Sequence, residues 1–343
     1  MTERLPLFII TGFLGSGKTT LLQQLLRKPS TGTTGVVVNE FGEVGLDHRL
    51  LVHAKEHLEL VEGGCICCAR RQDIGEAIHD LVRRAQREGG NPLARAVIET
   101  TGLADPSPVV SALGRDPWMR AHVRLGRVIC VLDAVNGLAS IAAHGEALRQ
   151  LAVADTVVVT KMDMGRAAEW GDLVSAVRSV TPDARILDAH APDFDLEQVF
   201  AAEDGVTPLH GSGFRAEDTT HAANWTSFVM HRDGALDWPA FTLWLSALLH
   251  AHGSRIVRVK GLLRTTTSPA PLVIHGVQHV VHPPRHLRPE DDDGQPGYLV
   301  FITNGIGRRE IEESLDRFLD RVRHPGARII GTAAVVARER AKA

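Results

Sequence analysis

Short apolar runs alternate with amphipathic stretches over roughly the first two hundred positions of the chain. The runs are rich in β-branched residues and almost continuously apolar, which is typical of parallel strands covered on both faces. They predict strands over residues 7–10, 35–38, 94–98, 128–132 and 156–159. Helical periodicity predicts helices over residues 19–28, 73–88 and 167–180. Strands that alternate with helices in this way predict an α/β domain with a doubly wound, mostly parallel sheet.

The pattern changes over residues 206–224, where Gly, Ser, Thr, His and charged residues predict a linker. Beyond it, apolar runs predict strands over residues 225–230, 255–260, 271–275, 277–281 and 298–303. Helices are predicted over 238–250 and 309–322, and the first presents one apolar face formed by Trp238, Phe241, Leu245 and Leu248. This order predicts a smaller α+β domain with a mostly antiparallel sheet. We therefore divide the chain into a larger domain (1–205), a linker (206–224) and a smaller domain (225–343).

The overall composition narrows the classes of partner. The 343 residues are 44% hydrophobic and 23% charged, which is ordinary for a soluble globular protein and enough for two domains. The formal net charge of −3 gives no support to nucleic-acid or membrane-surface binding, and no apolar run is long enough for a transmembrane helix. A strand follows the N-terminus directly and leaves no room for a signal peptide. We therefore expect a cytoplasmic protein with no nucleic-acid and no membrane partner.

A phosphate-binding loop is predicted directly after the first strand. Gly12-x-x-x-x-Gly17-Lys18-Thr19 matches the Walker A pattern and is followed by a predicted helix. Glycines let backbone N–H groups turn toward phosphate oxygens, and the helix N-terminus adds positive potential. Lys18 would place its charge on the β- and γ-phosphates, and the Thr19 hydroxyl would bind Mg²⁺. The predicted nucleotide contacts here are Gly12, Gly15, Ser16, Gly17, Lys18, Thr19 and Thr20.

Two acidic residues at the ends of predicted strands could complete the magnesium shell. Glu99 follows the strand over 94–98, and Asp133 follows the strand over 128–132. We favour Glu99, because the Thr-Thr-Gly that follows it would let the backbone approach a γ-phosphate and respond to its loss. The alternative for Glu99 is a helix cap or a surface acid. Lys18, Thr19 and Glu99 are thus the predicted catalytic residues, with Thr19 and Glu99 holding Mg²⁺.

The residues after the strand over 156–159 indicate which base is bound. Thr160-Lys161-Met162-Asp163 fits the [N/T/S]-K-x-D element of GTPases. In that element the Asp carboxylate accepts two hydrogen bonds from guanine, and the Lys stem covers the ring. Adenine lacks this donor pair, so Thr160, Lys161 and Asp163 predict GTP. Thr in place of the commoner Asn is expected to weaken one supporting contact.

Three of the four cysteines fall within four residues, at Cys65, Cys67 and Cys68. They follow two glycines in what we interpret as a turn. Clustered thiolates repel one another unless a soft or borderline cation such as Zn²⁺ compensates their charge. Three ligands leave a fourth position open, which suits a metal that is later handed on; redox cycling is the competing interpretation. Cys130 lies inside an apolar strand and is expected to be a small buried hydrophobe.

Two further groups of residues could contribute to a metal site. Glu40 and Glu43 follow the second strand, where a P-loop GTPase carries its first switch. They could touch Mg²⁺, the cysteine-bound metal or both, which would link the nucleotide state to metal affinity. The alternative is a solvated acidic loop. The histidines between 275 and 286 are close in sequence but need not converge, and we do not assign them to a site.

Together these motifs resemble those of the CobW-like family of metal-chaperone GTPases, of the zinc or cobalamin type. The resemblance covers nearly the whole chain. It rests on residues 12–22, 38–47, 64–68, 99–106 and 160–163, and in the smaller domain on 258–261 and 275–284. It implies a slow GTPase that uses GTP and Mg²⁺, binds Zn²⁺ (Co²⁺ being the alternative) at the cysteines, and releases it to a client metalloprotein. It also implies a nucleotide-dependent homodimer.

Some features leave alternatives open. Zinc-handling members often carry a His-rich stretch between the domains, whereas this linker holds only His210 and His221. This departure weakens a specific assignment to zinc storage but not the cysteine site. The alternative functions are cobalt insertion in cobalamin biosynthesis and metal sequestration by a protein with a vestigial GTPase. A small-metabolite kinase is disfavoured by the guanine element and by the cysteines. Arg70 and Arg71 are candidates for an arginine finger, although a solvated helix start explains them better.

Overall fold

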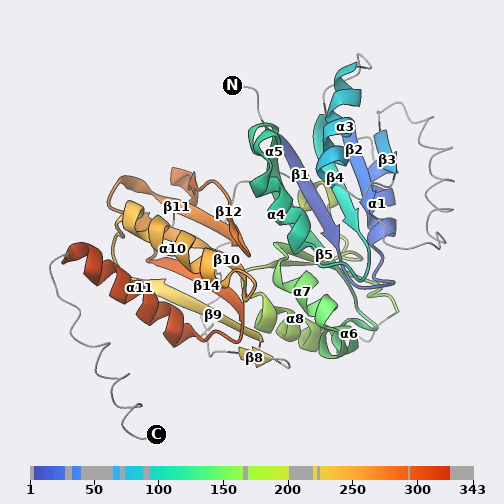
Figure 1. Ribbon diagram of the computed structural model, residues 1–343. Coiled ribbons are helices and arrows are strands. Elements are labelled where there is room, and N and C mark those ends of the chain that lie inside the picture. The colour runs from blue at the N-terminus through green and yellow to red at the C-terminus, as the bar shows by residue number, and fades with distance from the viewer. Residues whose placement is uncertain are drawn as a thin grey trace, which may run out of the picture.

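In the computed structural model, the described part of the chain forms two sheets of seven strands each (Figure 1). The structure describes residues 4–27, 33–39, 65–69, 74–87, 93–164, 169–200, 219–221, 225–292 and 294–324. The first sheet belongs to the N-terminal part and the second to the C-terminal part, in the order that the sequence predicts.

The first sheet is parallel throughout, with the strand order β3-β2-β4-β1-β5-β6-β7. Its strands are β1 (Leu5–Thr11), β2 (Thr33–Asn39), β3 (Cys65–Ala69), β4 (Leu93–Thr100), β5 (Val123–Asp133), β6 (Thr156–Thr160) and β7 (Arg185–Asp188). The five predicted strands and the doubly wound parallel sheet are confirmed. The order changes direction at β1, so the loops after β1, β4 and β5 meet at a topological switch point, where α/β proteins bind ligands.

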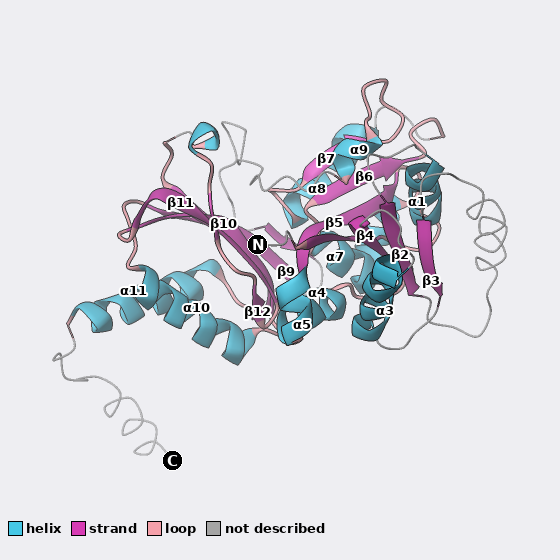
Figure 2. Cartoon of the chain, turned by 90° about the horizontal axis from the view of Figure 1, so that it is seen from above, coloured by secondary structure: helices cyan, strands magenta, loops and turns pink. Residues whose placement is uncertain are grey.

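Helices cover both faces of this sheet (Figure 2). On one face lie α1 (Lys18–Arg27) and α9 (Leu196–Val199). On the other lie α3 (Ile74–Arg87), α4 (Ser107–Arg115), α5 (Pro117–His122), α6 (Gly137–Ala143), α7 (Gly145–Ala152) and α8 (Glu169–Val180). Alternate residues of β1 serve the two cores: Phe8 and Ile10 pack under α1, whereas Leu7 and Ile9 pack on the opposite side. Among the described helices, none is long and apolar enough to cross a bilayer.

The cysteine cluster is not the turn that we expected. Cys65–Ala69 form the edge strand β3, parallel to β2, with Cys65 opposite Thr34 and Cys68 opposite Val37. The expectation was wrong because thiols are small and apolar enough for Cys-Ile-Cys-Cys-Ala to serve as a strand. The side chains of β3 lie outside the described residues, so the metal site itself stays a prediction.

The second sheet is antiparallel, as predicted, and two helices cover one of its faces. Its strands are β8 (Thr219–His221), β9 (Trp225–Arg232), β10 (Ile256–Thr265), β11 (Ser268–Val277), β12 (Val280–Val281), β13 (Arg285–His286) and β14 (Gly297–Asn304). The helices are α10 (Trp238–His252) and α11 (Arg308–Arg323). The single strand expected over 277–281 is wrong, because Gln278 has a positive φ of 51° and turns the chain between β11 and β12. The predicted linker lies mostly outside the described residues.

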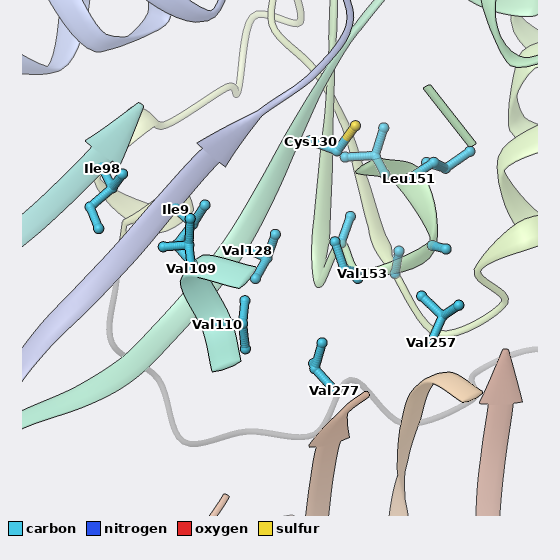
Figure 3. Packing of buried hydrophobic residues seen from close by; sticks show 14 of the residues in the cluster. Ile9, Ile98, Val109, Val110, Val128, Cys130, Leu151, Val153, Val257 and Val277 are labelled. Atoms are coloured by element: carbon cyan, nitrogen blue, oxygen red, sulfur yellow. The ribbon is translucent and has the colours of Figure 1, made fainter. Parts of the chain in front are cut away.

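The two parts share one hydrophobic core. Val257 and Val277 from the second sheet belong to the same buried cluster as Val110 and Val153 from the first part (Figure 3). Trp225 and Ile302 join this cluster as well. Continuous apolar packing of this kind holds the two parts in a defined orientation.

A buried ion network lies next to this shared core. Arg258, on β10, is 1% exposed and donates to two carboxylates of the first part: to Asp183 at 2.9 Å and to Asp155 at 3.2 Å. Its other terminal nitrogen donates to Thr181 Oγ1 at 3.0 Å. Lys260, also on β10, lies 3.0 Å from Asp155. The C-terminal part therefore supplies the cations for carboxylates that are buried at the N-terminal ends of β6 and β7.

The Asp155 carboxylate is also fixed by the backbone of β5. Its Oδ2 accepts the N–H of Val128 at 2.9 Å, and its own N–H donates to the Val128 carbonyl at 2.8 Å. Burial alone would raise the pKa of Asp155, but Lys260, then His275, then Arg258 hold that pKa well below its usual range. The residue is therefore a buried anion that depends on the second sheet for compensation.

Candidate functional site

The loop after β1 has the backbone shape that a phosphate cradle needs. Gly12, Gly15 and Gly17 have φ values of 142°, 72° and 95°, in the region that favours glycine. A Cβ at Gly12 would collide with the carbonyl oxygen of Val131 on β5. Since α1 begins at Lys18, the helix N-terminus opens onto the same loop.

Lys18 lies over this loop. Its Nζ donates to the carbonyl oxygens of Gly12 at 2.8 Å and Phe13 at 3.1 Å, and the residue is buried. These bonds hold the ammonium group above the loop, where phosphate oxygens would replace the two carbonyls. The geometry supports the predicted role of Lys18 as a positive charge on the β- and γ-phosphates.

Thr19 and Glu99 meet at the carboxyl edge of the sheet. The Thr19 hydroxyl donates to Glu99 Oε1 at 2.6 Å, although the two residues are 80 positions apart. A hydroxyl and a carboxylate are hard oxygen donors of the kind that Mg²⁺ selects. The pair therefore fits a magnesium site with two protein ligands, as the sequence predicts.

Asp133, the other candidate acid, has a different set of contacts. Its carboxylate pairs with Lys161 Nζ at 2.5 Å and accepts the backbone N–H of Val135 at 2.7 Å. Burial raises the pKa of Asp133, but the hydrogen bond from Lys161 and the backbone donors outweigh this and lower it. Because Asp133 already compensates Lys161, the geometry supports Glu99 as the magnesium acid.

The loop after β6 is tied to the phosphate loop. The Thr160 hydroxyl donates to the Ser16 carbonyl at 2.7 Å, so threonine does supply a supporting contact here. Lys161 has a φ of 58°, which is uncommon for a residue with a side chain and occurs at functional turns. Asp163 has 61% of its side chain exposed and lies 3.3 Å from His190 Nε2. A carboxylate at an exposed loop tip is accessible to a guanine edge, which supports the predicted GTP selectivity.

A contact that the sequence pattern did not reveal fixes the segment after Glu99. Gly102 is packed against the phosphate loop so closely that a Cβ there would lie 2.8 Å from Leu14 Cα. Gln150, which is fully buried on α7, donates from Nε2 to the carbonyls of Gly102 and Ala104, each at 3.0 Å. The ring of Phe13 in the phosphate loop also stacks on His144, directly before α7. This helix therefore supports both loops that would face the γ-phosphate.

Family models match most of the chain. The model described as CobW/HypB/UreG, nucleotide-binding domain, matches residues 6–188, and the one described as Cobalamin synthesis protein cobW C-terminal domain matches residues 225–319. The chain belongs to the CobW/HypB/UreG family. The predicted resemblance to CobW-like proteins is thereby confirmed for both parts of the chain.

Proteins from two organisms are similar to this chain over most of their length. Zinc chaperone YjiA of Escherichia coli (strain K12) is 29% identical over 309 residues, which cover 88% of this chain and 95% of YjiA. The zinc-regulated GTPase metalloprotein activator 1 of Saccharomyces cerevisiae is also 29% identical, covering 93% of this chain and 84% of its own. The crystal structure of Zn(II)-bound YjiA GTPase from E. coli superposes with a TM-score of 0.68 at 26% identity, covering 92% of this chain and 99% of YjiA.

Part of the site predicted for this CobW-family domain falls outside the described residues. This applies to Glu40, Glu43, Arg70 and Arg71, and to the side chains of the three clustered cysteines. Within the described ranges, no three His, Cys, Asp or Glu side chains converge as metal ligands. The rings of His275 and His282 are 5.1 Å apart, but the histidines over 275–286 form no such cluster.

Gln150→Leu tests how the CobW-family domain holds the segment after Glu99. The change keeps the side chain's size but removes the donor to the Gly102 and Ala104 carbonyls, which we expect to lower the free energy of unfolding by about 1–3 kcal/mol. GTP turnover should fall about tenfold, because a loop that touches the phosphate loop loses its position. GDP affinity should change less, since the segment faces the γ-phosphate side. Single-turnover hydrolysis and GDP titration would measure the two effects.

The matched control for this prediction is Gln198→Leu, an exposed glutamine on α9. It should leave turnover unchanged. Equal losses of GDP affinity and turnover in Gln150→Leu would contradict a specific role for the segment after Glu99.

Proposed function

We propose that the chain is a GTP-hydrolysing metallochaperone that binds Zn²⁺ at Cys65, Cys67 and Cys68 and couples GTP hydrolysis to metal transfer. The protein is a GTPase of the CobW family, and similar proteins are zinc chaperones and a zinc-regulated metalloprotein activator. The metal is the substrate that is carried, whereas GTP and Mg²⁺ drive the cycle. Cobalt insertion in cobalamin biosynthesis is the alternative use of the same site.

The observation that carries the coupling is the register of three neighbouring strands. Glu99 on β4 lies opposite Val38 on β2, and Val38 lies opposite Ala69 on β3. Ala69, Val38 and Glu99 are thus level with one another across the three strands, and Cys68 is one residue before this level on β3. Since neighbouring strands are about 4.8 Å apart, the backbones of Ala69 and Glu99 are separated by about 10 Å. Successive residues of a strand alternate faces, so a metal bound by all three cysteines would require β3 to open near Cys68. Such a metal and a nucleotide at the end of β4 would share one edge of one sheet.

The residues at this same edge of the first sheet would also carry out GTP hydrolysis. Backbone N–H groups of the phosphate loop and Lys18 would bind the β- and γ-phosphates, and Thr19 and Glu99 would hold Mg²⁺. When bound there, Mg²⁺ would neutralise charge on the phosphate oxygens. Asp163 would accept hydrogen bonds from guanine, while Lys161 is held by Asp133. The segment of Gly102 would move when the γ-phosphate leaves, which gives the cycle its two states.

The cysteine strand and the predicted acidic switch provide the link to the metal. Residues 40–43 follow β2, the strand between β3 and β4, so Glu40 and Glu43 are candidates to touch both Mg²⁺ and the carried metal. Nucleotide and metal must then change each other's affinity by equal free energies. We further propose that the GTPase domain spans 1–205, the linker 206–224 and the C-terminal domain 225–343.

Partner binding would use the same edge of the first sheet. Four of the seven large apolar residues that are exposed in the described part of the chain lie on loops after β1, β4, β5 and β6. They are Leu14, Leu103, Val135 and Met164. Exposed apolar residues grouped around a nucleotide site mark an interaction surface. We propose that the client metalloprotein, or a second copy in a nucleotide-dependent dimer, docks here. We also propose that the protein is cytoplasmic.

The experiment that tests the proposal compares the metal affinity of two nucleotide states. Zn²⁺ titration of the protein bound to GDP and to a non-hydrolysable GTP analogue should give dissociation constants that differ about fivefold or more. Replacing Cys65, Cys67 and Cys68 together with serine should abolish both the tight site and the difference. Cys130→Ala is the matched control, since burial raises the pKa of that thiol to about 12 and keeps it from binding metal.

Two results would contradict the proposal. Equal Zn²⁺ affinities in the two states would make the chain a metal-binding protein without a switch. Tight, nucleotide-dependent Zn²⁺ binding that survives the triple serine variant would assign the metal to other residues.

A further inference from the structure

A cavity of about 960 Å³ lies between the two parts of the molecule. Arg4 directly precedes β1, Arg124 is the second residue of β5, and Arg185 begins β7, and all three line the cavity. The cavity is therefore at the amino edge of the first sheet, whereas the phosphate loop is at the carboxyl edge. With seven residues in β1 and about 3.3 Å per residue, the two sites are about 20 Å apart.

The lining of this cavity is strongly basic. Seven arginines and Lys260 line it, and the only carboxylate among the described lining residues is Asp155. That carboxylate already accepts from Lys260 and Arg258. The whole chain has a formal net charge of −3, so the positive charge here is a local concentration and not a reflection of the composition. A concave wall of one sign focuses the field and attracts anions.

Three of the arginines come from separate elements and approach one another. Arg4 precedes β1, Arg124 lies on β5, and Arg285 lies on β13 in the C-terminal part. Burial lowers the pKa of Arg285, and the charges of Arg124 and then Arg4 lower it further. Guanidinium groups from both parts of the fold therefore line the same cavity.

Most of the other residues that line the cavity are apolar or carry imidazole rings. Leu125, Val273 and Val280 add apolar surface, and His275 and His282 add ring nitrogens. The Nε2 atoms of both rings are buried and have no hydrogen-bond partner among the described residues. A buried polar nitrogen without a partner is rare, and a ligand group is one way to satisfy it.

We propose that this cavity between the two parts binds a small organic polyanion, with at least two phosphate or carboxylate groups on a partly apolar body. Guanidinium groups bind both kinds of oxyanion through paired N–H donors, and the apolar wall would cover the body of the ligand. The volume is in the range of small-molecule pockets. The site lies outside the metal and nucleotide residues of the proposed function and does not depend on them.

The test uses full-length protein loaded with GDP and Mg²⁺, so that the phosphate loop is already filled. Calorimetric titration at low salt with citrate and, separately, with inorganic pyrophosphate should show binding that weakens as salt screens the charges. Arg124→Gln and Arg285→Gln should each weaken binding by about fivefold or more, because each removes a charge-assisted contact. Arg285→Lys should recover part of the loss, since it keeps the charge.

The matched control is Arg309→Gln, an exposed arginine on α11 that lies outside the cavity. It should bind both probes like the unaltered protein. Thermal melting and GDP affinity would establish that each variant is folded. Binding of both probes, of pyrophosphate alone or of citrate alone would each support the site and would distinguish a phosphate from a carboxylate ligand.

Other outcomes would overturn the proposal. The proposal is wrong if neither probe binds at millimolar concentration, or if excess GDP displaces the bound probe. It is also wrong if Arg309→Gln weakens binding as much as Arg124→Gln and Arg285→Gln do. Binding of an acidic peptide or a nucleic acid in the absence of binding of either small probe would also assign the basic surface to a macromolecule instead.

Discussion

Lys18→Ala is expected to lower the rate of GTP hydrolysis by about 100- to 1,000-fold, the loss typical of removing one preorganised charge from a transition state. Lys18 is the cation that the phosphate loop holds above its own carbonyls, 2.8 Å from that of Gly12. Without it, charge that develops on the transferring phosphoryl group loses its nearest side-chain partner. Single-turnover hydrolysis at saturating GTP and Mg²⁺ measures the change without a contribution from product release.

The matched control for Lys18→Ala is Arg27→Ala, which removes an exposed cation from the last turn of the same helix. It should leave the rate within about twofold. The Lys18 variant also separates two hypotheses, because a metal-sequestering protein with a vestigial GTPase would keep its metal affinity and its activation of the client. Unchanged hydrolysis in Lys18→Ala would remove the phosphate loop from the mechanism.

Arg258→Met is expected to lower the free energy of unfolding by about 3 kcal/mol. Breaking a buried ion pair by removing one partner costs about 3–5 kcal/mol, since a charge is left buried without compensation. Two carboxylates, Asp155 and Asp183, depend on this guanidinium, but Lys260 remains 3.0 Å from the first of them. The lower end of the range therefore applies. Urea denaturation followed by tryptophan fluorescence would measure the midpoint and the cooperativity of the transition.

Arg309→Met provides the comparison for this variant, because its partner Glu313 lies on the same exposed helix surface. Surface pairs of this kind contribute about 0–1 kcal/mol. If both methionine variants unfolded at the same urea concentration, the network would not hold the two parts together. A separate early transition in Arg258→Met alone would show that the two parts then unfold independently.

The features predicted from the sequence are those that local pattern determines. Strands of the first sheet are continuous apolar runs, and the phosphate loop is a contiguous motif whose glycines require specific φ values. The pairing of Thr19 with Glu99 could also be anticipated, because parallel strands bring their carboxyl ends to one edge. The guanine element was recognisable for the same reason, from its place at the end of β6.

Other features depend on contacts between residues far apart in sequence. Gln150 has no local signal, because its role arises only when α7 is folded beneath the segment of Gly102, 48 positions away. Arg258 and Asp155 are 103 positions apart and come from different sheets. The strand β3 was not predicted, for a different reason: its thiols are small and apolar enough to form a strand, but they lack the β-branched pattern that marks one. The cavity between the two parts likewise depends on how the sheets pack and on no single motif.

The shared core described above determines where this chain can be divided. If expression stopped before β9, Val110 and Val153 would lose the cover of Val257 and Val277, and an apolar face would be open to water. Asp155 and Asp183 would lose Arg258 at the same time. A GTPase fragment cut at the sequence boundary would therefore tend to aggregate, and its low activity would be mistaken for a catalytic defect. Biochemical work on either half is better done with point variants of the intact chain than with fragments.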